Sequence, residues 1–161
     1  MGKLERFTER YQDRGPTVYR AGEGDALTLA RLVVEGVVDS GMAPGASNQK
    51  KAQIAARAYR EIETAMGCGE SAFVSLLAYR DDSLAGMVFV RAAGVDLWDG
   101  KMVAAVSCLY VLPRFRGDPS CALGLMRAAK EAAEDMGAQR IRVVVSSEDM
   151  RAMRRYGHAN V

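Results

Sequence analysis

The sequence has little histidine and cysteine, and it has no long apolar run. Its single histidine, His158, leaves little material for a histidine-based metal site or a Ser-His-Asp triad. Three cysteines are an odd number and their spacing fits no metal site, so we expect a reducing, cytoplasmic setting. No stretch of about eighteen apolar residues occurs, and we therefore expect no membrane-spanning helix and no membrane partner.

The sequence also lacks an excess of charge of either sign. It holds 22 basic and 20 acidic residues, which gives a formal net charge of +2 at pH 7. Domains that bind nucleic acid usually carry a strong basic excess, so we expect no nucleic-acid partner. The first fifteen residues are too charged for a secretion signal. An arginine-rich stretch near the C-terminus is either a solvated face or a surface for phosphate or a partner: Arg140, Arg142, Arg151, Arg154 and Arg155.

Length and apolar content are those of a single domain. With 161 residues, of which 49% are hydrophobic, the chain can bury a core unaided. We expect an N-terminal amphipathic extension over residues 1–16 and one domain over residues 17–161. In the extension, Leu4, Phe7 and Tyr11 recur at helical spacing between charged residues. A helix this short needs a surface to lie on, either on its own domain or on a partner chain.

Apolar patterns along the domain predict a strand, two helices, three antiparallel strands, a helix and a strand. The strands are expected at residues 17–20, 71–80, 84–93, 101–112 and 140–145, and the first two helices between Asp25 and Ser40 and at about 48–66. Asp81-Asp82 is the expected turn of a hairpin. The strands on either side of this turn are almost continuously apolar, which indicates that both of their faces are buried, and the last strand is also expected to be buried.

The most informative stretch runs from Cys108 to Gly137. An apolar run that ends at Leu112 predicts a strand, and a Pro-Arg-Phe-Arg-Gly-Asp-Pro turn leads from it to a helix of about five turns. We expect Asp118 to cap this helix, Pro119 to occupy its first turn and Gly137 to end it. A glycine-containing turn onto a helix N-terminus presents unpaired N–H groups to an anion. The stretch therefore predicts a phosphate-bearing cofactor.

This stretch resembles the central motif of the GNAT superfamily, the acyl-CoA-dependent N-acetyltransferases. That motif has an apolar strand, a V-x-P-x-x-R-G-x-G-x-G/A turn, a Leu- and Ala-rich helix and a Val/Ile strand, here at residues 109–117, the helix to Met136, and 141–145. The chain departs from the motif at Pro119, where the family has its second glycine, and at Cys121. The order of predicted elements is also that of the family. The resemblance implies an α/β (α+β) fold whose mixed, largely antiparallel sheet is flanked by helices.

The resemblance implies acetyl-CoA as the cofactor and direct transfer of its acetyl group to an amine. The pantetheine arm would pair with the main chain of two strand residues, and the pyrophosphate would lie on the turn that follows. The implied cofactor-binding residues are Leu109, Val111, Arg114, Arg116, Gly117, Asp118, Ser120, Cys121 and Ala122. The acceptor, a small-molecule or protein amine, would lie beside the first two helices and their connecting loop.

Two residues of the turn oppose this cofactor. Pro119 has no N–H to donate. The carboxylate of Asp118, as a helix cap, would accept the free amides meant for phosphate, and its negative charge would repel the ligand. Arg114, Arg116 and Arg127 could offset part of this effect.

The expected catalytic acid is Tyr156, on a last helix at about residues 149–156. It lies three residues, about one helical turn, from the position of the family's tyrosine, so it either reaches the acetyl group or packs the helix end. Cys121 lies near a helix N-terminus, which lowers a thiol pKa, and it and Cys108 are alternative nucleophiles. His158 is either a surface residue or a proton shuttle.

The chain stops at Val161, where the family normally begins another strand. We expect this final strand to be missing or supplied by a partner, which would leave an open sheet edge. A homo-oligomer or a partner chain could form through this edge and the N-terminal segment. The alternative to an enzyme is a catalytically decayed GNAT-fold protein with a structural or interaction role, for example a phage virion-associated subunit found in the virion instead of the cytoplasm.

Overall fold

A computed structural model describes residues 15–144 of the chain. These residues form a sheet of five strands in the order β1-β2-β3-β4-β5. The strands are β1 (Thr17–Arg20), β2 (Phe73–Arg80), β3 (Ser83–Val95), β4 (Met102–Val111) and β5 (Arg140–Val143). The helices are α2 (Ala26–Asp39), α3 (Asn48–Gly67) and α4 (Ser120–Asp135), with short 3-10 turns η1 (Glu23–Asp25) and η2 (Pro113–Phe115). Neighbouring strands are antiparallel except β4 and β5, which are parallel, so the expected mixed, largely antiparallel sheet is confirmed.

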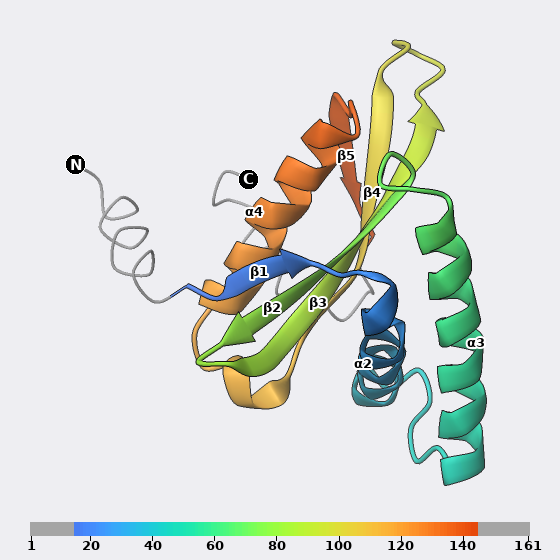
Figure 1. Cartoon of the computed structure of the whole chain (residues 1–161), viewed down its shortest axis with the longest axis vertical. Coiled ribbons are helices and arrows are strands. Elements are labelled where there is room, and N and C mark those ends of the chain that lie inside the picture. The colour runs from blue at the N-terminus through green and yellow to red at the C-terminus, as the bar shows by residue number, and fades with distance from the viewer. Residues whose placement is uncertain (1–14, 145–161) are drawn as a thin grey trace.

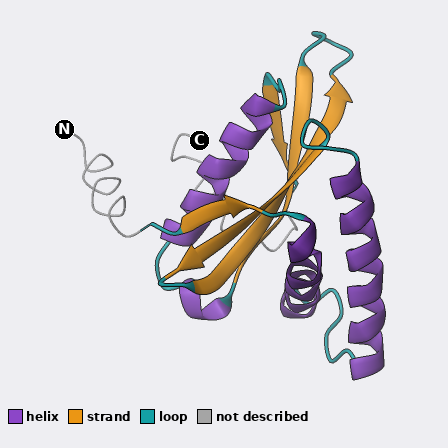
Figure 2. Ribbon diagram, in the orientation of Figure 1, coloured by secondary structure: helices purple, strands orange, loops and turns teal. Residues whose placement is uncertain are grey.

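Helices cover both faces of the sheet (Figures 1 and 2). On one face, Leu125 and Ala129 of α4 pack against valines of the central strands, among them Val88 and Val106. The second core lies on the opposite face, where residues of α2 and α3 contact the other side of the same strands: Leu29, Ala30 and Ile62 against Phe73, Leu77, Met87 and Phe89. Because the central strands are covered twice, their sequences are apolar almost throughout, as the sequence analysis predicts.

The hairpin between β2 and β3 is confirmed. Asp81 and Asp82 both have positive φ, at 50° and 60°, as a two-residue turn with the twist of the flanking strands requires. Aspartate tolerates this conformation because its short polar side chain can bond locally. The turn places Arg80, the last residue of β2, close to the beginning of α4.

A bulge interrupts the pairing of β3 with β4. Met87 pairs with Tyr110 and Phe89 with Ser107, so the two residues Cys108 and Leu109 lie opposite Val88 alone. Cys108 has a φ of 54° inside the strand, which is the positive φ that a bulged residue can adopt. The bulge bends β4 at the point where the expected cofactor-binding residues begin.

Two expectations about local structure are wrong. The strand at residues 140–145 is not buried, because Arg140 and Arg142 are exposed while Ile141 and Val143 are half-buried. Within the described residues β5 borders only β4. Of its two faces, only the one that carries Ile141 and Val143 packs on the core beneath α4. The central helix begins at Ser120, with Pro119 in the N-cap position, one residue later than the sequence suggests.

Several expectations lie outside the described residues. They are the amphipathic helix of the N-terminal extension, the last helix with Tyr156 and His158, and the missing final strand. Within residues 15–144, no helix combines the length and the apolar character that crossing a membrane requires.

Candidate functional site

The pairing of β5 with β4 ends halfway along β4. Residues 103–106 pair with residues 140–143, and the N–H of Val144 donates to the carbonyl of Val106 at 2.8 Å. Among the described residues, no strand pairs with this side of β4 beyond that bond. The second half of β4, residues 107–111, therefore keeps one row of main-chain groups without a strand partner in this part of the chain.

The alternation of an antiparallel ladder shows which groups belong to that row. The N–H of Leu112 donates to the carbonyl of Ala85 on the β3 side at 2.8 Å. Neighbouring residues of a strand direct their main-chain groups to opposite sides, so those of Leu109 and Val111 face away from β3. We call the main-chain groups of Leu109 and Val111 the β4 edge. These are the two residues whose main chain the resemblance assigns to the pantetheine arm.

The turn after β4 delivers free amides to the N-terminus of α4. Its first part is satisfied internally, because the N–H of Arg116 donates to the carbonyl of Pro113 at 3.2 Å. Leu123 likewise donates to the carbonyl of Pro119 at 3.0 Å. Within the described part of the chain, the remaining amides of the turn have no acceptor, and they belong to Gly117, Asp118, Cys121 and Ala122. Unpaired amides at a helix N-terminus, with the favourable helix dipole, are suited to a phosphate group.

The carboxylate of Asp118 occupies one position of this turn. Its Oδ1 accepts the N–H of Ser120 at 2.8 Å and also the Ser120 hydroxyl. Its Oδ2 accepts Nη1 of Arg80 at 2.6 Å. The Ser120 hydroxyl and the Arg80 guanidinium lower the pKa of Asp118 from 3.8 to about 2, against an opposing effect of partial burial. Asp118 thus withdraws the Ser120 amide from any ligand, while Arg80 balances its charge.

Arg80 is a residue that sequence reasoning missed. It stands 38 residues before Asp118, at the end of β2, and no local motif marks it. Its guanidinium is also 3.4 Å from the Ser120 hydroxyl, so it lies beside the free amides of the turn. The one sequence signal for Arg80 is its place directly before the Asp81-Asp82 hairpin, because the length of β2 determines which residue reaches the turn before α4.

The two arginines expected to face phosphate have other partners in the structure. Nε of Arg116 donates to the carbonyl of Val111 at 2.7 Å, and its Nη2 lies 2.5 Å from Asp39 at the end of α2. The Arg116 guanidinium also stacks over the ring of Tyr110 at 5.3 Å. Arg114 reaches the carbonyl of Leu84 at 3.4 Å. One acceptor of the β4 edge, the Val111 carbonyl, is therefore occupied by a side chain of the protein itself.

Cys108 and Cys121 do not have the environment of reactive thiolates. Cys121 is fully buried, and burial raises its thiol pKa although Arg80 opposes the effect. The expectation that the helix N-terminus lowers this pKa is therefore wrong, because desolvation dominates. Burial also raises the pKa of Cys108, against the opposing effects of a Ser107 hydrogen bond and the Arg91 charge. Among the described residues, no group of three or more His, Cys, Asp or Glu side chains could hold a metal ion.

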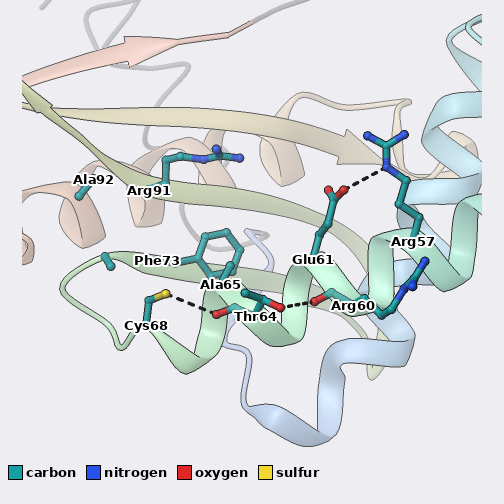
Figure 3. A pocket seen from close by; sticks show the side chains of 10 residues that line it. Arg57, Arg60, Glu61, Thr64, Ala65, Cys68, Phe73, Arg91 and Ala92 are labelled. Carbon is teal, nitrogen blue, oxygen red and sulfur yellow. Dashed lines mark hydrogen bonds and ion pairs between the residues drawn. The ribbon is translucent and has the colours of Figure 1, made fainter.

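A cavity lies on the face of the sheet opposite α4. It is formed between the C-terminal half of α3 and the adjoining ends of β2 and β3 (Figure 3). Its volume is about 580 Å³, which suits a small molecule. Its polar lining includes Arg57, Arg60 and Glu61 from α3 and Arg91 from β3. The resemblance predicts that the acceptor lies against the first two helices, and of these two α3 lines the cavity.

The structure brings the cofactor-binding candidates together at one end of β4. From Leu109 to Ala122, all of them lie on the second half of β4, the following turn or the first turn of α4. Tyr156, the expected acid, lies outside the described residues. The free groups of the site fit an extended ligand that ends in phosphate. Two groups of the site already have partners within the protein: the Ser120 amide is bound by Asp118, and the Val111 carbonyl is bound by Arg116.

Comparison with protein-family models gives one match. The family described as Acetyltransferase (GNAT) family matches residues 46–159. Comparison with curated protein sequences finds no significant match.

Solved structures resemble this fold at low sequence identity. A predicted acetyltransferase from Clostridium acetobutylicum, solved with acetyl-CoA, superimposes with a TM-score of 0.72 at 16% identity over 88% of each chain. A GCN5-related N-acetyltransferase from Ralstonia eutropha gives 0.69 at 13% identity over 89% of this chain and 92% of that chain. A ribosomal-protein-alanine N-acetyltransferase from Brucella melitensis gives 0.63 at 16% identity over 91% and 92%. At these identities the likeness concerns the fold.

Proposed function

The chain belongs to the acetyltransferase (GNAT) family, and from this membership we propose that it transfers an acetyl group from acetyl-CoA directly to an amine. The observation that carries the proposal is the continuity of free main-chain groups from the β4 edge to the N-terminus of α4. After the bulge, β4 has no strand partner on the side away from β3 within the described residues. The turn that follows β4 presents four amides without acceptors. A CoA thioester, with an amide-containing arm and a pyrophosphate, has the chemistry that this series of groups would bind.

Each part of the chain has a separate role in the proposed reaction. When bound, acetyl-CoA supplies an activated acetyl thioester. The β4 edge would hold the arm through Leu109 and through the N–H of Val111, since Arg116 occupies the Val111 carbonyl. The free amides of Gly117, Asp118 and Ala122 would bind the pyrophosphate, and Arg80 would add positive charge beside them, whereas the amide of Cys121 belongs to a fully buried residue. Tyr156 is the proposed donor of a proton to the leaving sulfur.

A second candidate function is a GNAT-fold protein that no longer binds the cofactor. The observation that favours it is the hydrogen bond from the Ser120 amide to Asp118, which fills part of the turn with the protein's own carboxylate. Pro119 removes a further donor from the same turn. We favour the enzyme because four amides of the turn and most of the β4 edge are still free of partners among the described residues.

The experiment is a thermal-shift titration with acetyl-CoA, followed by an assay for free CoA thiol in the presence of amine acceptors. The enzyme proposal predicts a rise in Tm with increasing acetyl-CoA, and acceptor-dependent release of thiol. Asp118→Asn keeps an oxygen acceptor for the Ser120 amide and removes the negative charge, so it should bind acetyl-CoA several-fold more tightly. No change in Tm at millimolar acetyl-CoA, for the wild type and for Asp118→Asn, would favour the second candidate.

A further inference from the structure

We infer that the acetyl acceptor of this enzyme is a small amine that also carries an anionic group, a phosphate or a carboxylate. The inference rests on the proposed function, because it concerns the acceptor of that reaction. It comes from the charges around the cavity beneath α3, which lies on the face of the sheet opposite α4.

The cavity is predominantly cationic. Its charged lining consists of Arg57, Arg60 and Arg91 against a single carboxylate, Glu61. Arg57 and Glu61 pair one turn apart on α3 at 3.0 Å, with 78% and 68% of their side chains exposed, so this pair is weak and can exchange partners. Within the described residues, no carboxylate lies within salt-bridge distance of Arg60 or Arg91. Arg60 and Arg91 therefore have no carboxylate partner in this part of the chain. Of the two, Arg91 extends along the cavity above Phe73, whereas the Arg60 side chain extends away from Arg91 (Figure 3).

The register of the sheet extends this positive charge beyond the cavity. Phe73 of β2 pairs with Arg91 of β3, Arg91 with Ala105 of β4, and Ala105 with Arg142 of β5. Directly paired residues of neighbouring strands point to the same face, so this row lies on the face that α3 covers. Arg91 and Arg142 flank the small side chain of Ala105, and two strand spacings separate them by roughly 10 Å. Arg142 is exposed and adds a further cation to this face.

The row lies next to the end of the pairing between β4 and β5. Ala105 directly precedes Val106, whose carbonyl makes the last described bond to β5. The bulge at Cys108 follows, and the charge of Arg91 acts on that thiol. An anion held by Arg91 would thus place the rest of a small acceptor near the bulge, while the proposed cofactor approaches from the β4 edge.

The chemistry of the lining indicates which anions fit. A guanidinium binds a carboxylate or a phosphate through two parallel hydrogen bonds, and it stays charged at any physiological pH. Phe73 supplies an apolar surface in the same cavity, which suits the carbon skeleton between the anionic group and the amine. The volume of about 580 Å³ admits a metabolite-sized molecule. Neutral amines would leave these cations without a partner, so discrimination should favour the anionic acceptor.

Calorimetry of matched amines with the full chain, without acetyl-CoA, tests the inference. The probes are O-phosphoethanolamine and β-alanine, compared with ethanolamine and propylamine, which lack the anionic group. We expect at least one anionic probe to bind about tenfold more tightly than its neutral counterpart, and the two arms show whether phosphate or carboxylate is preferred. Arg91→Gln should weaken that binding by about tenfold, and Arg60→Gln should weaken it less, because its side chain extends away from Arg91. Arg31→Gln, the same change at an exposed position of α2 outside the cavity, should leave it unchanged.

Equal binding of anionic and neutral probes by the wild type would overturn the inference. So would unaltered anion binding in a doubly substituted Arg60→Gln, Arg91→Gln protein whose circular dichroism matches the wild type. Because acetyl-CoA is absent, these results do not depend on cofactor binding. If the anionic probes bind but acetyl-CoA does not change the Tm in the thermal-shift titration, the proposed function is refuted and the anion site remains.

Discussion

At the scale of single residues, Asp118 decides how much of the turn is open to a ligand. Its two carboxylate oxygens satisfy the Ser120 amide and hydroxyl on one side and the Arg80 guanidinium on the other. A negative charge at a helix N-terminus is stabilising for the fold, and the same charge repels phosphate. Stability and the proposed cofactor binding therefore place opposite demands on this residue, and Arg80 reduces the conflict by neutralising the charge.

The lowered pKa of Asp118 predicts a pH-dependent contribution to stability. The carboxyl has a pKa of about 2 in the folded chain against 3.8 otherwise, so its contribution is complete above about pH 5 and is lost as the pH falls toward 2. Asp118→Asn should lower the free energy of unfolding by about 1 kcal/mol at pH 6, after allowance for solvent exposure, and by much less near pH 2. Urea unfolding at a series of pH values measures the difference.

Arg80→Gln is the companion to that experiment. The Ser120 hydroxyl has a larger effect on the Asp118 pKa than Arg80 has, so this variant should retain part of the pH dependence that Asp118→Asn loses. Unfolding curves that keep a constant separation between wild type and Asp118→Asn from pH 6 to pH 2 would show that the carboxylate is not held as described.

Residue-level chemistry was predictable only where its partners are close in sequence. The bond from the Ser120 amide to Asp118 spans two residues, and the aspartate-before-helix pattern predicts such a contact. The partners Arg80 and Asp39 come from distant elements, and their contacts depend on strand lengths and helix ends that no local pattern encodes. The same limit explains why the cationic cavity, built from α3 and β3, was not predicted.

At the scale of elements, the second half of β4 determines the site. The strand approaches β3 closely here, where Gly86 pairs with Val111 just beyond the bulge. A Cβ at Gly86 would lie 2.4 Å from the Tyr110 carbonyl oxygen and 3.2 Å from Cδ1 of Leu125. Both neighbours belong to the packed centre of the molecule, so there is no room for even a methyl group.

Gly86→Ala should therefore destabilise the fold by about 3 kcal/mol, because β4 must move away from β3 or the side chain must displace the α4 core. Gly22→Ala is the matched control, since nothing lies within 4 Å of its Cβ and its φ is −101°. Thermal or urea unfolding of both variants measures the effect. A Gly86→Ala protein as stable as the Gly22→Ala protein would contradict the described packing of β3 on β4.

The elements themselves could be predicted well from apolar runs and turn residues. The runs around Asp81-Asp82 predict β2 and β3 closely, because strands buried on both faces carry little polar interruption. For β5, the same pattern predicts burial on both faces, and this prediction is wrong. Its sequence is rich in Val and Ile, but periodicity cannot show that a strand has one neighbour among the described residues and one open face. The bulge at Cys108 also escapes pattern analysis, since an inserted residue leaves no compositional mark.

At the scale of the whole molecule, the sheet separates two regions with different chemistry (Figure 1). The α4 side offers free main-chain amides and a helix N-terminus, and the α3 side offers a cavity lined by arginines. The two regions lie toward opposite ends of β2, because Arg80 at its end contacts the turn and Phe73 at its beginning lines the cavity. A transferase must bring two substrates to one point, and in the proposed reaction the cofactor arm would lead along the β4 edge toward the row through Ala105.

The central claim is that acetyl-CoA binds along the β4 edge and at the amides of the following turn. The most direct test is an amide NMR titration of the full chain with acetyl-CoA. We predict chemical-shift changes centred on Leu109, Val111, Gly117, Asp118, Cys121 and Ala122, with the Ser120 amide changing less because Asp118 holds it, and with the distant amides of α3 unaffected. No shifts at these residues at millimolar acetyl-CoA, or shifts centred elsewhere, would contradict the account.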